Sequence, residues 1–249
     1  MTQLYDSIGA RYGRFRQPDP RIASAIVDAL GPSESVVNVG AGAGSYEPSD
    51  RRVIAVAVEP SSTMIRQRPR GAAPVVQASA MQLPFEDATF AASLAILTVH
   101  HWADRAGGFV ELVRVARERV VLLTFDTETS RFWLVDDYFP EIAENDRRMM
   151  PAIEEIEQAV GPIEVRPLLI PHDCNAGFLG AYWRRPEAYL DAGVRSAISA
   201  FALLRNAEPG LARLREDLRS GAWHDRHADL LARQEIDLGY RLITSRRIP

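Results

Sequence analysis

Three glycines at alternating positions, Gly40, Gly42 and Gly44, follow directly on an apolar stretch of the chain. Glycine has no side chain, so it lets a backbone turn tightly and approach a ligand closely. A second apolar stretch ends at Glu59, where a carboxylate can accept hydrogen bonds from both hydroxyls of a ribose. Together these features predict a nucleoside-cofactor site. The simpler interpretation is a tight turn, with Glu59 merely preceding a helix that starts at Pro60.

The spacing of the glycines bears on which cofactor binds. The dinucleotide fingerprint has the spacing GxGxxG, whereas here the third glycine comes one residue early and Ser45 stands in its place. The loop is therefore a poor match to a nicotinamide-dependent oxidoreductase, which stays open as an alternative.

The elements that must position these residues are continuous apolar runs at residues 35–39, 53–58, 75–76, 90–99 and 120–125. Such runs are typical of strands covered on both faces, as in a parallel sheet with flanking helices. Helices expected at 22–30, 60–67 and 106–116 alternate with them. The order predicts an α/β fold with a Rossmann-like, doubly wound sheet. Residues 40–52 are few for a parallel crossover, so we expect the helix there to be reduced to about a turn.

The whole chain, residues 1–249, is expected to form a single domain. Residues 1–30 would form an N-terminal lid and helix, residues 31–125 a cofactor-binding core, and residues 126–249 a cap, a helical insertion and the final strands. Within this last part the pattern predicts a loop or cap at 126–150, a helix at 153–160 and a strand at 163–170. Helix is then expected over most of 171–235, and a last strand at 238–244.

Composition excludes several classes of protein. The net charge is −4, which argues against nucleic acid as a partner. No apolar stretch is long enough to cross a bilayer, and the first residues lack the pattern of a signal peptide, so we expect a cytoplasmic protein with no membrane partner. Cys174 is the single cysteine, which excludes an internal disulfide and a cysteine metal cluster; a packed thiol is expected. The oligomeric state is not predicted.

Four motifs in order resemble the small-molecule class I S-adenosylmethionine-dependent methyltransferases, the type 11 group near the ubiquinone and menaquinone enzymes. They are the glycine loop, Glu59, the run Ser79-Ala80-Met81-Gln82-Leu83-Pro84-Phe85, and Leu97-Thr98-Val99-His100-His101-Trp102. The N-terminal Tyr5-Asp6 and Tyr12 also resemble the family's segment that folds over the cofactor. The resemblance covers about residues 1–125 and implies S-adenosyl-L-methionine as the cofactor. The residues it assigns to that cofactor are Tyr5, Asn38, Gly40, Ala41, Gly42, Gly44, Glu59, Pro60, Met64, Ser79, Ala80, Met81 and Leu97.

Two positions depart from the family pattern. Asn38 stands where the family has an acidic residue, and Ser79 stands where it has an aspartate beside the adenine. An amide at position 38 can still hydrogen-bond the amino acid end of the cofactor, but without charge. These departures keep open a non-catalytic scaffold or partner subunit that binds the cofactor without turnover.

His100 and His101 are the candidate bases for methyl transfer. A base is needed only if the nucleophile must lose a proton, and imidazole titrates near neutral pH. If the strand stays extended, adjacent side chains point to opposite faces, so only one histidine would face the methyl, and His101 is the better match to the family motif. Tyr12 could pair with it, similar to indole carbon methyltransferases that act on tryptophan-derived natural products. A histidine that packs beneath the cofactor is the structural alternative.

Aromatic residues beyond position 125 are expected to lie mainly in the core, and any that line a pocket would favour a flat, apolar small-molecule substrate. This set comprises Phe132, Trp133, Tyr138, Phe139, Phe178, Tyr182 and Trp183. His224 and His227 lack a further obvious ligand, so no metal site is expected. The sequence thus predicts S-adenosylmethionine-dependent methyl transfer to a small aromatic or apolar metabolite of natural-product type.

Overall fold

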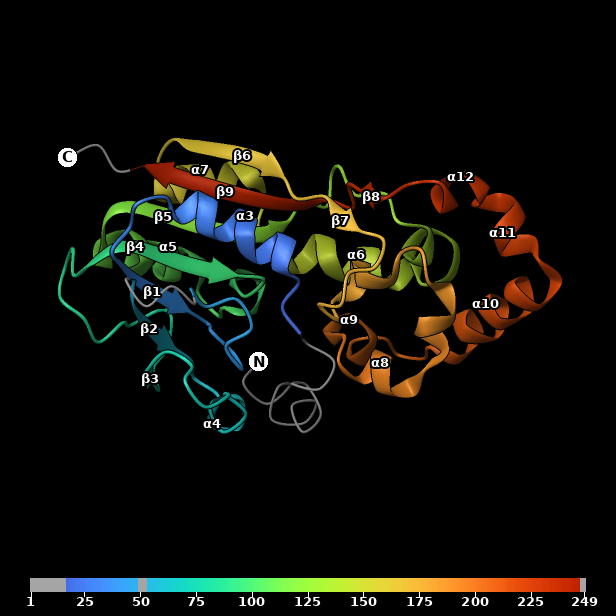
Figure 1. The fold of residues 1–249 in the computed structure, drawn as a ribbon, viewed down its shortest axis with the longest axis horizontal. Helices are drawn as coiled ribbons and strands as arrows, with labels where there is room; N and C mark the ends of the chain where they lie inside the picture. The colour runs from blue at the N-terminus through green and yellow to red at the C-terminus, as the bar shows by residue number, and fades with distance from the viewer. Residues whose placement is uncertain (1–16, 49–52, 247–249) are drawn as a thin grey trace.

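The computed structural model describes residues 17–48 and 53–246, and a seven-stranded sheet forms one half of it (Figure 1). Its strand order is β3-β2-β1-β4-β5-β9-β6. The strands are β1 (Ser35–Val39), β2 (Ile54–Val58), β3 (Val75–Val76), β4 (Phe90–Ile96), β5 (Ala116–Phe125), β6 (Ile163–Pro167) and β9 (Tyr240–Arg246). Strands β1 to β5 run parallel, and β9 is antiparallel to both β5 and β6. The predicted doubly wound sheet is therefore confirmed.

The chain order reverses between β1 and β4, because β2 and β3 lie on one side of this pair and β5 on the other. Ligands bind in such sheets at the carboxyl ends of the strands, where the order reverses. This edge carries Gly40 after β1, Glu59 after β2 and Leu97 after β4. The topology thus brings three of the sequence motifs to one place.

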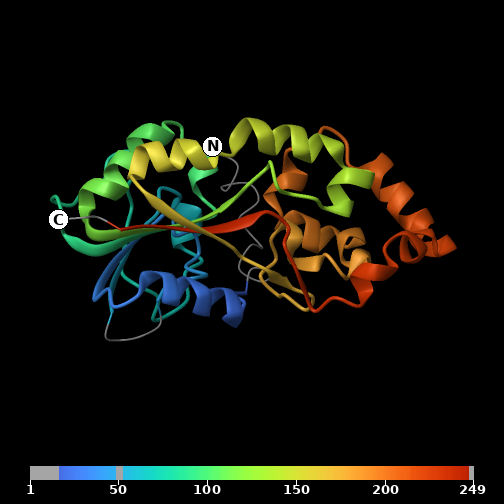
Figure 2. The same ribbon diagram turned by 90° about the horizontal axis from the view of Figure 1, so that it is seen from above.

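Helices cover both faces of the sheet (Figure 2). Helix α3 (Pro20–Leu30) packs on one face, where its Ile22, Ile26 and Leu30 join a cluster with strand residues such as Leu94. Helices α5 (Arg105–Val115) and α7 (Ile153–Val160) pack on the other face. Strand β1 is buried almost throughout, which explains why its sequence is a continuous apolar run.

Residues 126–150 and 168–239 form a mostly helical part beside the sheet, with a small hairpin of β7 (Ile170–Pro171) and β8 (Glu235–Ile236) (Figure 2). Its helices are η3 (Leu134–Tyr138), α6 (Pro140–Met149), η4 (Leu179–Tyr182), η5 (Pro186–Leu190), α8 (Ala192–Ser196), α9 (Ser199–Ala202), α10 (Glu208–Ser220), α11 (Ala222–Arg226) and α12 (Ala228–Leu231). All seven aromatic residues singled out in the sequence are buried here. The prediction that they form mainly core is confirmed.

Two predicted elements were wrong in detail. Residues 140–149 form helix α6 and not a loop. Pro140 at its first position and Arg147 and Arg148 in its last turn are typical of a helix. The helix was not predicted because Ile142 is its one buried residue, which leaves only a weak apolar pattern. The strand expected at 163–170 is divided between β6 and β7, which lie in different sheets. Pro167, where β6 ends, has no N–H with which to continue a ladder.

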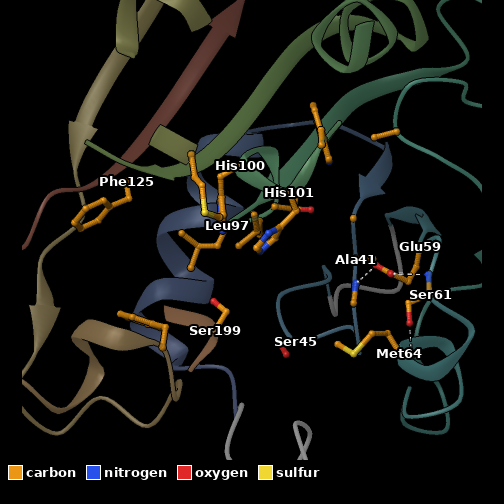
Figure 3. A pocket seen from close by; sticks show the side chains of 18 of the residues that line it. Ala41, Ser45, Glu59, Ser61, Met64, Leu97, His100, His101, Phe125 and Ser199 are labelled. Carbon is orange, nitrogen blue, oxygen red and sulfur yellow. Dashed lines mark hydrogen bonds between the residues drawn. The ribbon is translucent and has the colours of Figure 1, made fainter. Parts of the chain in front are cut away.

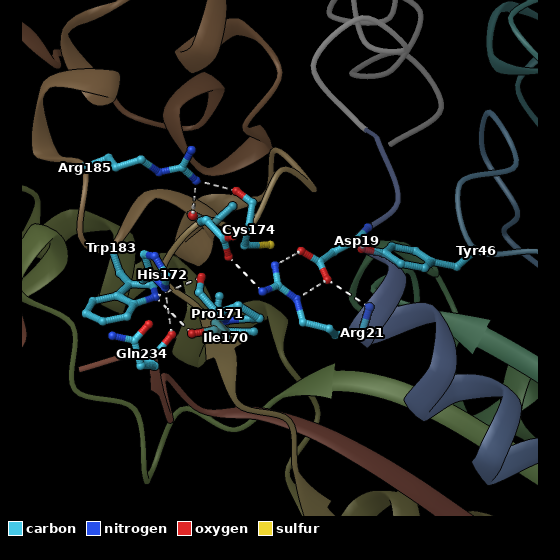
Figure 4. A network of polar contacts seen from close by, with 12 residues as sticks. Asp19, Arg21, Tyr46, Ile170, Pro171, His172, Cys174, Trp183, Arg185 and Gln234 are labelled. Carbon is cyan, nitrogen blue, oxygen red and sulfur yellow. Dashed lines mark hydrogen bonds and ion pairs between the residues drawn. The ribbon is translucent and has the colours of Figure 1, made fainter. Parts of the chain in front are cut away.

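The start of α3 is tied to two other parts of the chain (Figure 4). Asp19 caps the helix, and the Arg21 guanidinium lies 2.7 Å from the carboxylate of Asp19 and 2.8 Å from that of Asp173 in the helical part. The backbone N–H of Asp19 donates to the hydroxyl of Tyr46 at 3.4 Å. Hydrogen bonding to Arg21 lowers the pKa of Asp19. Helix α3 therefore links the glycine-loop region to the helical part.

Candidate active site

A cavity of about 390 Å³ opens where the carboxyl ends of β1, β2 and β4 meet (Figure 3). That volume lies in the range of roughly 300–1,000 Å³ typical of small-molecule sites. The predicted residues that line it are Asn38, Gly40, Ala41, Gly42, Glu59, Pro60, Met64, Ser79, Ala80, Met81, Leu97, His100 and His101. Gly44 is not among the lining residues, and Tyr5 and Tyr12 lie outside the described residues.

The glycine loop has a backbone that only glycine adopts easily. Gly40, Gly42 and Gly44 have φ angles of +72°, +54° and +88°. A Cβ on Gly40 would lie 2.1 Å from Oγ1 of Thr98, which follows β4. The N–H groups of Gly40 and Ala41 both donate to the carbonyl oxygen of Val58, at 2.8 and 3.0 Å. The loop therefore folds closely against the ends of β2 and β4, and Gly44 contributes through its backbone conformation.

Glu59 is held rigidly at the end of β2. One carboxylate oxygen accepts from the N–H of Gly42 at 2.8 Å and the other from the N–H of Ser61 at 2.9 Å, and the residue is 7% exposed. Helix α4 (Ser62–Ile65) is capped by Ser61, not by Glu59. A carboxylate has two acceptor oxygens, so a group fixed in this place suits the two hydroxyls of a ribose.

Asn38 presents an acceptor that no described residue satisfies. Its Oδ1 atom is buried without a hydrogen-bond partner in residues 17–48 and 53–246, and the residue, which lines the cavity, is 4% exposed. A buried acceptor left unpaired costs about 1–3 kcal/mol. The ammonium group at the amino acid end of S-adenosylmethionine is a donor of the right kind. This orphaned atom, the glycine cradle and the Glu59 carboxylate all fit that cofactor.

Helix α5 holds the run Ser79–Phe85 from behind the cavity. The N–H of Leu83 donates to Glu111 at 2.7 Å, while Arg114 donates to the carbonyl oxygens of Phe85 and Leu83 at 2.7 and 3.1 Å. Arg114 also hydrogen-bonds Glu111 and so lowers the pKa of that carboxyl. The Ser79 hydroxyl accepts from the N–H of Met81 at 3.3 Å. The side of the cavity predicted for adenine is thus anchored on a helix of the core.

The link after the glycine loop has no helix within its described residues 40–48, in line with the short crossover expected from the sequence. Its place is taken by an ion pair between Glu47 and Arg68, 2.5 Å apart, with side chains 7% and 5% exposed. Arg68 also donates to the carbonyl oxygens of Ala73 and Gly42, at 2.8 and 3.4 Å. This buried pair joins the glycine loop to the turn after α4.

The extended strand expected up to Val99 is wrong. Strand β4 ends at Ile96, Leu97 has a φ of +48°, and residues Val99–His101 form the 3-10 helix η2. Alternation along a strand therefore does not separate the two histidines, and both His100 and His101 line the cavity. Their rings are in contact, with centroids 3.8 Å apart and planes tilted by 50°. In Figure 3 they lie between the glycine-loop half and a second half of the cavity near Phe125 and Ser199.

The second half of the cavity was not predicted from the sequence, except that some aromatic residues beyond position 125 could line a pocket, as Phe178 does. It is mostly apolar and is built by the end of β5, by α6, by the segment around Phe178, by α9 and by β9. Its residues are Phe125, Asp146, Met149, Met150, Ala176, Phe178, Leu179, Ile198, Ser199, Ala200, Leu203 and Tyr240. The ring of Tyr240 packs edge-on against Phe178 and Phe125, at centroid distances of 4.8 and 5.3 Å. No motif marks these positions, because distant segments supply them.

Other candidate groups lie away from this cavity. Cys174 is fully buried, and burial raises the pKa of its thiol to about 11, as expected for a packed thiol. His227 contacts Asp137 at 3.1 Å in the helical part. In the described residues, no group of three or more His, Cys, Asp or Glu side chains could hold a metal ion. No helix in that same part of the chain is long and apolar enough to span a membrane.

Comparison with known proteins assigns the family. Residues 37–124 match the family model of a methyltransferase domain. The chain is 36% identical to an Anabaena variabilis protein named as a methyltransferase from an antibiotic biosynthesis pathway, over 93% of this chain and 98% of that one, with a TM-score of 0.86. No curated protein matches the chain.

Two more distant structures share the fold. A S-adenosylmethionine-dependent methyltransferase from Thermotoga maritima aligns over 100% of both chains with 14% identity and a TM-score of 0.57. Geranyl diphosphate C-methyltransferase from Streptomyces coelicolor, solved with S-adenosyl-L-homocysteine, aligns over 92% of this chain and 76% of that one, with 16% identity and a TM-score of 0.52. The family model and the Anabaena protein argue against the alternative of a nicotinamide-dependent oxidoreductase. The chain belongs to the class I S-adenosylmethionine-dependent methyltransferases, and S-adenosylmethionine is its cofactor.

Proposed function

We propose that this enzyme methylates a small aromatic or otherwise apolar metabolite of natural-product type. The observation that carries the proposal is the continuity of the cavity, which runs from the glycine loop past His100 and His101 to a mostly apolar wall. An apolar wall with few polar groups favours a substrate with a hydrophobic body. The Anabaena relative, named from an antibiotic biosynthesis pathway, supports a substrate of this type.

The cofactor would lie in the half of the cavity built by the ends of β1, β2 and β3. Glu59 would accept the ribose hydroxyls, Asn38 would accept from the amino acid end, and Ser79 to Met81 would contact the adenine. When bound, S-adenosylmethionine supplies a methyl group on a positively charged sulfur. The protein then contributes mainly by alignment, which can supply about 7–11 kcal/mol in well-oriented reactions.

His101 is the residue we propose as the general base, with His100 as its neighbour in the same wall. Carbon methylation of an indole-like ring is the reaction we assign to this arrangement. The ring carbon would form the new bond to the methyl as the sulfur–methyl bond breaks, the sulfur would leave as a neutral thioether, and the proton of that carbon would pass to the imidazole. Tyr12 is the proposed partner of the base and belongs to residues 1–16. A cytoplasmic location remains a prediction from the sequence.

The test measures cofactor binding and turnover separately. S-adenosyl-L-homocysteine should raise the melting temperature and NAD should not. Methyl transfer from radiolabelled S-adenosylmethionine should appear on a member of a panel of indoles, phenols and arylamines. His101→Ala should lower kcat with little effect on S-adenosyl-L-homocysteine affinity, whereas His224→Ala, an exposed histidine outside the cavity, should leave both unchanged. Tight cofactor binding without turnover on the whole panel would favour the non-catalytic scaffold instead.

A further inference from the structure

Asp146 is a carboxylate on the wall of the cavity that the cofactor motifs do not use. It lies in the last turn of α6, one helical turn before Met150, which also lines the cavity. The N–H of Met150 donates to the backbone oxygen of Asp146 at 2.8 Å, and Arg105 at the start of α5 donates to the carbonyl oxygen of Met149 at 3.1 Å. These two contacts fix the end of α6 beside the segment that carries His101.

No described residue neutralises this carboxylate. Asp146 forms no ion pair and no side-chain hydrogen bond within residues 17–48 and 53–246, although arginines adjoin it in sequence and in space. Arg147 and Arg148 are exposed, and Arg148 donates to Asn145. Arg105 is paired with Glu155 at 3.0 Å. Arg148 and Arg105 are therefore directed to other partners, and Arg147 is exposed.

The charges of the cavity point to the chemistry of the missing partner. The described lining residues include two carboxylates, Glu59 and Asp146, and no arginine, in a chain that has no lysine. Glu59 already accepts from two backbone N–H groups, whereas Asp146 has none. An anion in the last turn of a helix is also disfavoured by the helix dipole. A carboxylate that costs stability at its position is better explained by binding than by folding.

We propose that Asp146 binds a protonated amine of the methyl acceptor, so that the substrate class is an arylalkylamine. The inference rests on the proposed function and specifies its substrate. Met149, Met150, Phe178 and Leu203 supply the apolar wall for the aromatic body, and Asp146 supplies the counter-charge for the amine. Desolvation raises the pKa of Asp146 to about 6, and an ammonium group in contact with it would reverse that cost.

The experiment compares matched probes on the enzyme loaded with S-adenosyl-L-homocysteine. Tryptamine and phenethylamine are titrated by calorimetry at pH 8 against their uncharged counterparts, 3-propylindole and propylbenzene, and against indole-3-propionate. The amines should bind about 10-fold more tightly than the uncharged probes, a difference of about 1.4 kcal/mol, because only the amines can donate a charged hydrogen bond to Asp146. Asp146→Asn should remove that preference. Glu144→Gln, an exposed change on the same helix, should keep it.

The outcomes separate this inference from the proposed function. Asp146→Asn should bind S-adenosyl-L-homocysteine as the parent does; a loss of that affinity would place Asp146 in the cofactor site and overturn the inference. Equal binding of charged and uncharged probes, or no binding of any amine, would also overturn it while leaving the methyltransferase assignment intact. An Asp146→Asn variant with full amine affinity but low turnover would make Asp146 a base and not an anchor.

Discussion

The carboxylate of Glu59 accepts a hydrogen bond from the backbone N–H of Gly42 at 2.8 Å, which joins the end of β2 to the glycine loop. Its other oxygen is fixed by the N–H of Ser61 at 2.9 Å. Both oxygens therefore hold their positions before any ligand arrives, and an acceptor that is already ordered loses little conformational entropy on binding. The ribose site proposed for Glu59 is preorganised by the same loop that the cofactor contacts.

Glu59→Gln should weaken S-adenosyl-L-homocysteine binding about 10- to 100-fold. The amide has a single oxygen for two N–H donors, and it lacks the charge that strengthens a hydrogen bond to ribose by about 1.5–3 kcal/mol. Isothermal titration calorimetry measures the change. Glu157→Gln, an exposed substitution on α7, is the control and should keep the parental affinity. If Glu59→Gln also kept the parental affinity, Glu59 would only stabilise the glycine loop through Gly42 and would not bind the cofactor.

Gly40→Ala should destabilise the protein and abolish cofactor binding, whereas Gly71→Ala should do neither strongly. Both glycines have positive φ angles, +72° and +88°. A Cβ at Gly71 meets nothing within 4 Å, but a Cβ at Gly40 would lie 2.1 Å from Oγ1 of Thr98. The backbone strain, about 1 kcal/mol, is common to both, so the difference measures the collision. Urea denaturation and calorimetry would show it, and equal effects of the two changes would refute the steric explanation.

The centre of the sheet was predictable because β1 and β4 are buried on both faces and therefore appear as continuous apolar runs. Residues 35–39 match β1 at both ends. The positions of the glycine loop and of Glu59 were predictable because the loop needs residues that adopt positive φ angles and the end of β2 carries a carboxylate.

The end of β4 was not predictable. Leu97 adopts a φ of +48°, which is uncommon outside glycine, and no residue in Leu97–His101 signals that turn.

The second half of the cavity escaped prediction for a different reason. Asp146, Phe178 and Tyr240 come from α6, from the segment before η4 and from β9, so only the tertiary fold brings them together. In the sequence, Asp146 looks like one more surface charge, because α6 also contains Glu141 and Glu144. Burial, and not residue type, distinguishes it.

Arg68→Ala should lower the free energy of unfolding by about 3–5 kcal/mol, because it leaves the buried carboxylate of Glu47 without its counter-charge. The two side chains are 5% and 7% exposed, and Arg68 also braces the glycine loop through the carbonyl oxygen of Gly42. S-adenosyl-L-homocysteine affinity should fall as well, since the loop loses that support.

The matched control for this pair is Arg219→Ala on α10. Arg219 lies 2.6 Å from Glu216, but the side chains are 74% and 59% exposed, and exposed ion pairs contribute only about 0–1 kcal/mol. Urea denaturation of both variants gives the comparison. A loss at Arg68 as small as that at Arg219 would mean that the Glu47–Arg68 pair does not secure the link after β1.

Asp146→Asn should stabilise the ligand-free enzyme at pH 8 and not at pH 4. Burial raises the pKa of Asp146 to about 6 from the ordinary 3.8, so the folded state binds the proton more tightly than the unfolded chain. The free energy of unfolding therefore falls as the pH rises from about 4 to 6, and the penalty is fully present above 6. The shift corresponds to a destabilisation of about 1–3 kcal/mol, which is absent in the variant because its amide is uncharged.

Urea denaturation of both proteins at the two pH values measures this difference directly. The other titratable groups that line the cavity in the described residues, Tyr46, Glu59, His100, His101 and Tyr240, are common to both proteins, so the difference between them isolates Asp146. A stabilisation that is the same at pH 4 and pH 8 would come from packing and not from charge. That result would contradict the electrostatic cost of Asp146, which is the reason for expecting an amine as the partner of this carboxylate.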